Sequence, residues 1–190
     1  MSAQLYPVFL RLEGRRVVLV GGGSVAASKL PALLDAAARV TVVAPEICDE
    51  LQRSGVTLAR RMFEPADLDG AFFVIAAATP EVNRAVAAAA AERGLFVNAV
   101  DDAASASAYL GGVVRRGGVT VAIGTAGRAP ALAGLLREAL NELLPDDLET
   151  WVSLGEYLRK QWKERGIAID ERRPLLLRAL QELYGAKEAP

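Results

Sequence analysis

The first half of the chain alternates short apolar runs with longer segments of helical composition. The run at residues 16–20 is rich in valine and ends in three glycines, and the segment after it is rich in Ala and Leu. Strands buried on both faces of a parallel sheet have this continuous apolar character, and helices make the crossovers between them. The pattern predicts an α/β fold with a Rossmann-type parallel sheet over about residues 12–110. The predicted strands are residues 16–20, 40–43, 56–60, 71–76 and 95–97, and the predicted helices are residues 24–38, 47–54 and 81–93.

The second half of the chain has a different pattern. Two apolar runs, at residues 110–114 and 119–123, are separated by Arg-Arg-Gly-Gly, which predicts a β-hairpin. Residues 129–144 have helical composition and end at a proline. Beyond them, apolar residues recur at helical spacing. We therefore expect a small strand-bearing region followed by a helical C-terminal tail. The recurring apolar residues are Trp151, Leu154, Leu158, Trp162, Leu176, Leu180 and Leu183.

Charge and hydropathy exclude several classes of protein. The net charge of -1 and the pI of about 5.7 provide no basic surface for neutralising the phosphates of a nucleic acid. The N-terminal residues lack the charged and apolar regions of a signal peptide, and no run of about 18 apolar residues occurs later. We expect a cytoplasmic protein that binds neither nucleic acid nor membrane.

The chemistry available to the chain is narrow. It contains no histidine and a single cysteine, Cys48, so it has neither an imidazole base nor an internal disulfide. The common zinc sites built from Cys and His are also excluded, and we expect no metal ligands. Any proton transfer must therefore use a carboxylate, Lys, Tyr or water.

Residues 21–26, with the sequence GGGSVA, fit the dinucleotide-binding pattern GxGxxA directly after a strand and at the start of a helix. Gly21 permits the tight turn, and Gly23 lets backbone amides approach a pyrophosphate. Ala26 is small enough for the helix to lie close to the strand, and the amides of Ser24 and Val25 face the phosphates. The alternative is a glycine-rich turn that only joins strand to helix.

Other cofactor-binding candidates follow the second and fourth strands. Pro45 and Glu46 come where a carboxylate normally accepts the ribose hydroxyls, although Glu46 equally fits the first turn of the next helix. No nearby arginine suggests a 2′-phosphate site, which favours NAD over NADP. Thr79 and Asn83 follow the fourth strand, where they either border the cofactor or cap the next helix.

Candidates for chemistry and for substrate binding come later in the chain. Asp101 and Asp102 follow the fifth strand, and without histidine a carboxylate such as Asp101 is the natural proton acceptor. Paired acids in a loop are also typical of a solvated turn. The loop GTAGRAP, at residues 124–130, offers Thr125, backbone amides and Arg128 to an anionic substrate group, unless it is a capped loop with a surface arginine.

Four motifs occur in order along the chain: YPVFLRLEGRRVVLVGGGSVAASK, VTVVAP, NAVDD, and GTAGRAP followed by LAGLLRE. With them the chain resembles the precorrin-2 dehydrogenase / sirohydrochlorin ferrochelatase family, including the N-terminal region of siroheme synthases. The resemblance implies NAD-dependent oxidation of precorrin-2 to sirohydrochlorin in siroheme biosynthesis, and a homodimer. Asp101 matches the functionally important Asp of the family. Because the substrate carries many carboxylates, we add Arg128 as an anchor from its charge alone.

The resemblance also implies the division of the chain into an NAD-binding Rossmann domain at residues 1–112, a dimerisation region at 113–146 and a helical C-terminal region at 147–190. Some members of the family insert ferrous iron, and the sequence leaves open whether Fe2+ is a substrate here. Three positions depart from the family pattern around the substrate pocket: Ala103, Ala108 and Gly111. Two other functions stay open, an NAD-sensing module without chemistry and a dehydrogenase of another anionic metabolite.

Overall fold

The computed structural model describes residues 4–185 and consists of two compact units. The first unit contains the chain up to Leu110 together with residues 126–129, and the second contains residues 111–125 and the chain from Pro130 onward. The chain therefore leaves the first unit to form a hairpin, returns to it for one short loop, and leaves it again. The division by function at residues 112 and 146 stays a prediction.

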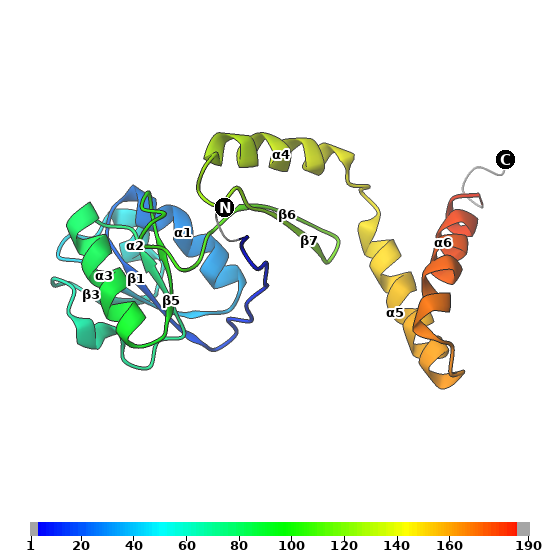
Figure 1. Ribbon diagram of the computed structural model, residues 1–190, viewed down its shortest axis with the longest axis horizontal. Helices are drawn as coiled ribbons and strands as arrows, with labels where there is room; N and C mark the ends of the chain where they lie inside the picture. Colours follow the sequence, from blue (N-terminus) through cyan, green and yellow to red (C-terminus); the bar gives the residue numbers. More distant parts are fainter. Residues whose placement is uncertain (1–3, 186–190) are drawn as a thin grey trace. The chain divides into compact units, whose positions relative to one another are not determined.

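The first unit is built on a five-stranded parallel sheet (Figure 1). Its strands have the order β3-β2-β1-β4-β5, and each predicted strand is present, β1 with the predicted ends and the others with ends shifted by at most two residues. The predicted Rossmann-type α/β fold is confirmed. The strands are β1 (Arg16–Val20), β2 (Arg39–Val43), β3 (Thr57–Ala59), β4 (Phe73–Ala76) and β5 (Phe96–Ala99).

Helices cover both faces of this sheet because the strands are apolar on both sides. Val17 and Leu19 of β1 pack toward α1 (Ser24–Asp35) and α2 (Asp49–Arg53), whereas Val18 and Val20 pack toward α3 (Pro80–Glu92). Figure 1 shows the resulting three layers. A short 3-10 helix, η1 (Pro65–Leu68), adds Leu68 to the α3 side.

The second unit contains the predicted hairpin and the helical tail. Strands β6 (Gly112–Arg116) and β7 (Val119–Ile123) are antiparallel, and α4 (Pro130–Leu143), α5 (Leu148–Glu164) and α6 (Ile169–Gly185) follow. The hairpin tip requires glycine at Gly117, because its φ is 53° and a Cβ there would lie 2.3 Å from the backbone nitrogen of Glu149. No helix within residues 4–185 is long and apolar enough to cross a membrane.

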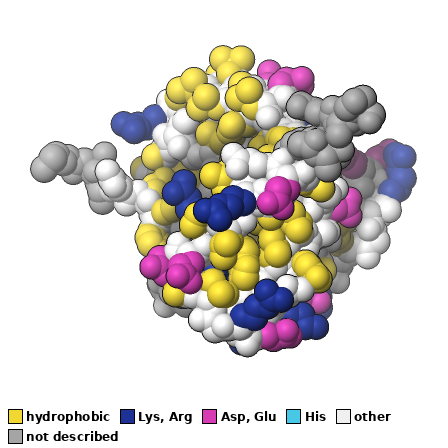
Figure 2. Space-filling model, turned by 90° about the vertical axis from the view of Figure 1, so that its right-hand side faces the viewer, with side chains coloured by type: hydrophobic (Ala, Val, Ile, Leu, Met, Phe, Trp, Pro, Cys, Tyr) yellow, Lys and Arg dark blue, Asp and Glu magenta, His cyan; other side chains and the backbone are white. Residues whose placement is uncertain are grey.

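Hydrophobic side chains also gather on the molecular surface, where Figure 2 shows several patches with charged side chains between them. One exposed set lies on α4. This helix packs on β6 through buried Ala133, whose carbonyl lies close to Gly112. Another face of α4 leaves four leucines exposed at positions that lie on one side of the helix. They are Leu132, Leu135, Leu136 and Leu143.

Asp67 is a buried acid that ties the loop after β3 to η1. The Arg61 guanidinium donates to both of its carboxylate oxygens, at 2.8 and 2.5 Å, and the Glu64 backbone N–H donates at 2.9 Å. These hydrogen bonds, chiefly that of Arg61, hold the pKa of Asp67 below its ordinary value of 3.8. A carboxyl that is harder to protonate in the folded state stabilises the fold above pH 3.8, and loses this contribution as the pH falls further.

We expect Asp67→Asn to lower the free energy of unfolding at pH 7 by about 1–3 kcal/mol, because it removes a charged acceptor from a pair with one buried partner. The deficit relative to wild type should shrink as the pH falls below about 3.8, where Asp67 itself becomes protonated. Urea unfolding at pH 7 and at pH 3 measures both effects. Asp69→Asn is the matched control, since that side chain is largely exposed and should change stability less. An equal deficit at both pH values would contradict the prediction.

Candidate functional site

The candidate site lies where the strand order reverses. β1 and β4 are neighbours, but the chain continues from β1 toward one edge of the sheet and from β4 toward the other. Loops that leave in opposite directions open a crevice at the carboxyl ends of the two strands, which is where ligands bind in sheets of this type. The loop after β1 is the predicted glycine motif, and the loop after β4 contains Ala77 and Thr79.

Two of the glycines are required by close backbone contacts. A Cβ on Gly21, whose φ is 131°, would lie 2.2 Å from the carbonyl oxygen of Ala77, and a Cβ on Gly22 would lie 1.8 Å from that of Glu46. The Gly22 carbonyl also accepts a hydrogen bond from the Cys48 N–H, at 2.8 Å. The GxGxxA pattern leaves Gly22 unspecified, so its role was missed from the sequence. It joins the glycine loop to the loop after β2.

Gly23 differs, because nothing lies within 4 Å of the position of its Cβ. It is the N-cap residue of α1, no side chain caps this end of the helix, and no acidic residue occupies the first turn. The first-turn N–H groups of Ser24 and Val25 therefore face an open, uncapped helix terminus, and Ala26 is fully buried behind them. An open helix N-terminus beside a glycine loop fits a pyrophosphate, so the residues present suit a dinucleotide.

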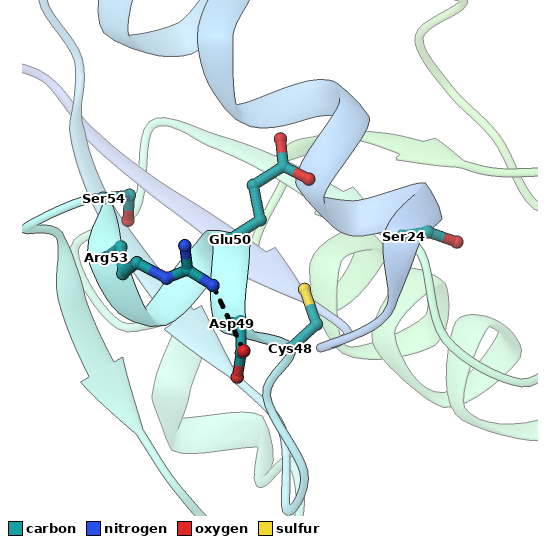
Figure 3. A pocket seen from close by; sticks show the side chains of 6 residues that line it. All are labelled: Ser24, Cys48, Asp49, Glu50, Arg53 and Ser54. Atoms are coloured by element: carbon teal, nitrogen blue, oxygen red, sulfur yellow. Dashed lines mark hydrogen bonds and ion pairs between the residues drawn. The ribbon is translucent and has the colours of Figure 1, made fainter.

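A pocket of about 510 Å³ borders the glycine motif on the β2 side. Figure 3 shows Ser24 at the start of α1 and Cys48, Asp49, Glu50, Arg53 and Ser54 from the chain around α2. Pro45 and Glu46 do not line it. The carboxylates there belong to Asp49 and Glu50. Asp49 forms an ion pair with Arg53, with 3.1 Å between a guanidinium nitrogen and a carboxylate oxygen.

Two expectations for this region are corrected. α2 begins at Asp49 rather than at residue 47, so Glu46 lies in the preceding bend and is not a first-turn acid. An arginine, Arg53, does line the pocket, although the sequence suggested that none was near. Residues 46–48 contact the glycine loop instead of starting the helix: Glu46 packs on Gly22 through its carbonyl, and Cys48 is extended and donates its N–H to the Gly22 carbonyl.

A second pocket, of about 370 Å³, borders the other side of the motif and contains the chemistry-bearing residues. It brings together Val25 of α1, Asn83 and Arg84 of α3, and Asp101 and Asp102 after β5. Three predicted site residues, Val25, Asn83 and Asp101, thus share one pocket. The larger pocket is the more open of the two and contains none of the candidates for proton transfer. We therefore place the candidate catalytic site in the smaller pocket.

Asp101 is exposed and has a left-handed backbone, with φ of 59°. Its neighbour Asp102 accepts hydrogen bonds from the Ser105 hydroxyl at 2.6 Å and from the Ser105 N–H at 3.2 Å. These bonds, the hydroxyl first, hold the pKa of Asp102 below its ordinary value. Because its oxygens already accept hydrogen bonds and its pKa is lowered, Asp102 is the weaker proton acceptor, which leaves Asp101 as the carboxylate of the pair suited to receiving a proton from a ligand.

Asn83 and Thr79 differ in position, because Asn83 lines the second pocket whereas Thr79 stands at the N-cap position of α3. Asn83 is 3% exposed, and its side-chain amide accepts from the Ala78 N–H at 2.9 Å and donates to the Val100 carbonyl at 3.3 Å. Its side chain is thus engaged by two backbone groups outside α3, so it does not cap the helix. Thr79 is the N-cap residue of α3, makes no side-chain cap hydrogen bond and does not line the pocket.

The loop that carries Arg128 lies beside the Asp101 turn. A Cβ on Gly127, whose φ is 72°, would lie 3.2 Å from the Cβ of Ala103, and the Tyr109 hydroxyl donates to the Ala103 carbonyl at 2.8 Å. Arg128 is exposed and directly follows this contact. Thr125 is half-buried and belongs to the second unit. Ala103, a departure from the family pattern, therefore lies where the two loops meet.

Arg84 is a cation that sequence reasoning missed. It lines the same pocket as Asp101 and pairs with Glu81, three residues before it on α3, at 3.3 Å. Its side chain is more than half exposed, so this pair is weak and leaves the guanidinium accessible. The signal available in the sequence was its place in the first turns of the helix that follows β4, at the rim of the crevice.

Comparison with known proteins agrees with this geometry. Residues 8–112, more than half of the chain, match the NAD_binding_7 family model, described as "Putative NAD(P)-binding". The chain belongs to this NAD(P)-binding family. The matched segment includes the glycine loop, the lining residues of both pockets and Asp101, so the candidate site lies within the part of the chain that matches the family.

The relatives are longer proteins. The chain is 42% identical to a siroheme synthase of Photorhabdus laumondii over 172 residues, and 40% identical to one of Chromobacterium violaceum over 176 residues. These matches cover 88% and 90% of the chain but 37% of each relative. The chain thus spans little more than a third of the length of these relatives.

A solved structure shares the fold. It is titled SirC, precorrin-2 dehydrogenase, and matches with a TM-score of 0.71 over 92% of this chain and 88% of that one. The sequence identity is 24%, so this likeness establishes the arrangement of a parallel sheet, a small hairpin and a helical tail. The whole of the predicted fold class is therefore shared with a known structure.

Proposed function

We propose that this chain is an NAD-dependent dehydrogenase that oxidises precorrin-2 to sirohydrochlorin in siroheme biosynthesis. The observation that carries the proposal is the position of Asp101, whose carboxylate lines one pocket with Val25 at the start of the glycine-loop helix. Cofactor-binding and proton-accepting groups thus border the same cavity. The names of the relatives, siroheme synthase and precorrin-2 dehydrogenase, agree with this reaction.

The roles of the residues follow from their positions. The amides of Gly23, Ser24 and Val25 bind the pyrophosphate, since they surround the open N-terminus of α1. When bound, NAD supplies the acceptor for the hydride that leaves the macrocycle. Asp101 accepts the proton lost in the same oxidation and passes it to solvent, to which it is exposed. One hydride and one proton together account for the two hydrogens removed.

Preference for NAD over NADP is part of the proposal. Asp49, Glu50 and the nearby Glu46 present carboxylates at the end of β2, where the ribose 2′ position of a dinucleotide lies in this fold. Carboxylates accept hydrogen bonds from ribose hydroxyls and repel a 2′-phosphate. Arg53 forms an ion pair with Asp49, but both side chains are largely exposed, so this pair is weak and the preference rests on the three carboxylates.

Cations near the second pocket would bind the carboxylates of the macrocycle. Arg84 lines the pocket, and Arg128 lies on the loop that contacts Ala103. Arginine suits this role because its planar group forms two parallel hydrogen bonds to a carboxylate. Thr125, next to this loop in the sequence, would add a hydroxyl donor.

Iron insertion into sirohydrochlorin is a second activity that the same site would support. The substrates would be Fe2+ and the macrocycle, and Asp101 would accept the protons that the metal displaces from the pyrrole nitrogens. The name siroheme synthase of the relatives favours this step. It is tested by adding ferrous iron after the oxidation is complete.

We propose that the protein acts as a homodimer through its second unit. The four exposed leucines of α4 form an apolar stripe whose burial by a second copy would be favourable. We expect sedimentation to show twice the chain mass, and Leu135→Glu, at a side chain that is 65% exposed, to shift the protein toward monomer. Glu138→Gln, which lies off the leucine face of the same helix, is the control and should leave the mass unchanged. A wild-type monomer would contradict the proposal.

The decisive experiment incubates the purified chain anaerobically with precorrin-2 and NAD, and separately with NADP. Reduction of the nicotinamide and the spectrum of the macrocycle are followed together, before and after ferrous iron is added. Sirohydrochlorin formation with NAD supports the dehydrogenase, and a further spectral change with iron supports insertion. NAD binding without turnover of precorrin-2 would overturn the proposal and favour a sensing module. Turnover of a different anionic metabolite would favour a dehydrogenase of that metabolite.

A further inference from the structure

The left-handed backbone of Asp101 is unusual for a residue with a side chain. Asp adopts this conformation more readily than most residues with a side chain, mainly in turns whose other contacts are fixed. Asp101 lies between two residues whose backbones are both tied. The hydrogen bonds that fix Val100 and Asp102 therefore determine where the Asp101 carboxylate is held.

On the N-terminal side, Val100 is fixed at both of its backbone polar groups. Its N–H donates to the Ala76 carbonyl at 2.9 Å, and its carbonyl accepts from the Asn83 side chain at 3.3 Å. Asn83 in turn accepts from the Ala78 N–H at 2.9 Å. One buried amide therefore links the chain just beyond β4 to the chain just beyond β5, and no polar ligand is needed to satisfy these contacts.

On the C-terminal side, Asp102 is fixed by a turn. Its N–H donates to the Ala99 carbonyl at 3.4 Å, and its carboxylate accepts both the N–H and the hydroxyl of Ser105. These two hydrogen bonds, that of the hydroxyl first, lower the pKa of Asp102. The side chain of Asp102 is thus engaged in hydrogen bonds within the turn.

We propose that Asn83 and the Asp102–Ser105 pair are positioning residues that hold Asp101 in its left-handed conformation and so present its carboxylate to the substrate. This rests on the proposed function, in which Asp101 accepts the proton. Asn83, predicted from the sequence to touch the cofactor, acts instead through Val100. Proton transfer depends steeply on distance, so a small displacement of the turn lowers the rate of the chemical step more than it weakens binding.

The test uses variants of the full chain that remove one tie at a time. Ser105→Ala removes the hydroxyl donor to Asp102, and Ser105→Thr retains a hydroxyl. Asn83→Asp keeps the acceptor for Ala78 but replaces the donor to Val100 by a carboxylate oxygen. Ser107→Ala is the matched control, because its hydroxyl binds the Val97 N–H of β5, further from Asp101.

We expect Ser105→Ala to lower kcat for precorrin-2 oxidation by about tenfold or more, with KM and the Kd for NAD within about twofold of wild type. Ser105→Thr should recover most of the rate, and Ser107→Ala should keep it. Asn83→Asp should lose at least as much as Ser105→Ala if it folds. Hydrogen exchange of the amides at residues 100–105 should be faster in Ser105→Ala, which reports the turn without reference to activity.

Two results would overturn the proposal: wild-type kcat in Ser105→Ala, or a loss that appears only in KM or in the Kd for NAD. Equal losses in Ser105→Ala and Ser107→Ala would do the same, since they would indicate general loosening of the loop. If the wild-type chain does not oxidise precorrin-2, the proposed function fails separately. Faster exchange in Ser105→Ala would then still support the turn contacts, and unchanged exchange would reject them.

Discussion

Asp101→Asn is expected to lower kcat for precorrin-2 oxidation by about 100-fold or more while the Kd for NAD stays within about twofold. Asparagine has the same shape as aspartate and tolerates the left-handed backbone of this position, so the fold and the turn should survive. Its amide cannot accept a proton, which removes the proposed chemical role alone. Nicotinamide reduction in steady state and NAD binding by calorimetry measure the two quantities.

Asp101→Ala should lose as much activity, but it places an alanine at φ of 59° and so mixes strain with lost chemistry. Asp69→Asn is the control for removal of an acid, since Asp69 is largely exposed and lines neither pocket. Turnover close to wild type in Asp101→Asn would refute the assignment of Asp101. A parallel loss of NAD binding would show that this side chain serves the cofactor instead.

The second prediction with a large expected effect is that substitutions of the adjacent residues Gly22 and Gly23 have different consequences for stability. Gly22→Ala places a Cβ where the Glu46 carbonyl lies 1.8 Å away, so the glycine loop and the loop after β2 must move apart. We expect a loss of about 1–3 kcal/mol in the free energy of unfolding, as for overpacked positions, together with weaker NAD binding. Gly23→Ala meets nothing within 4 Å, and its φ of -90° suits any residue, so stability should be unchanged.

Gly23→Asp completes the comparison. Its side chain enters the open space at the start of α1, so stability should again stay near wild type. A carboxylate there occupies the position proposed for the pyrophosphate and repels it, which should raise the Kd for NAD about tenfold or more. Thermal unfolding and NAD titration distinguish the three variants. Tight NAD binding by Gly23→Asp would contradict the placement of the phosphates.

Local sequence patterns determined most of the elements. The apolar runs of β1, β2 and β4 are buried on both faces, as strands of a covered parallel sheet are, and the Ala-rich segments after β1 and β4 form α1 and α3. The glycine motif is likewise local, because the turn, the helix terminus and buried Ala26 all lie within six residues. Asp101 was found by elimination in a chain without histidine and by resemblance.

Contacts between loops that are distant in sequence could not be predicted in this way. Gly22 is needed because the Glu46 carbonyl packs on it, and the acids and Arg53 share a pocket with Ser24 because the chain around α2 lies beside the start of α1. Asn83 binds Val100, and Arg84 shares a pocket with Asp101, only because β4 and β5 are neighbours in the sheet.

The sequence by itself therefore determined the strands, the helices and the residue types available for chemistry, since hydrophobic period and backbone preference act over a few neighbouring residues. Only the tertiary structure decided which side chains lie beside the glycine motif and which form the hydrogen bonds that position Asp101. Those partners depend on the strand order β3-β2-β1-β4-β5, which brings the carboxyl ends of β1, β4 and β5 to one edge. No pattern within a single segment records which loops will face each other across that edge.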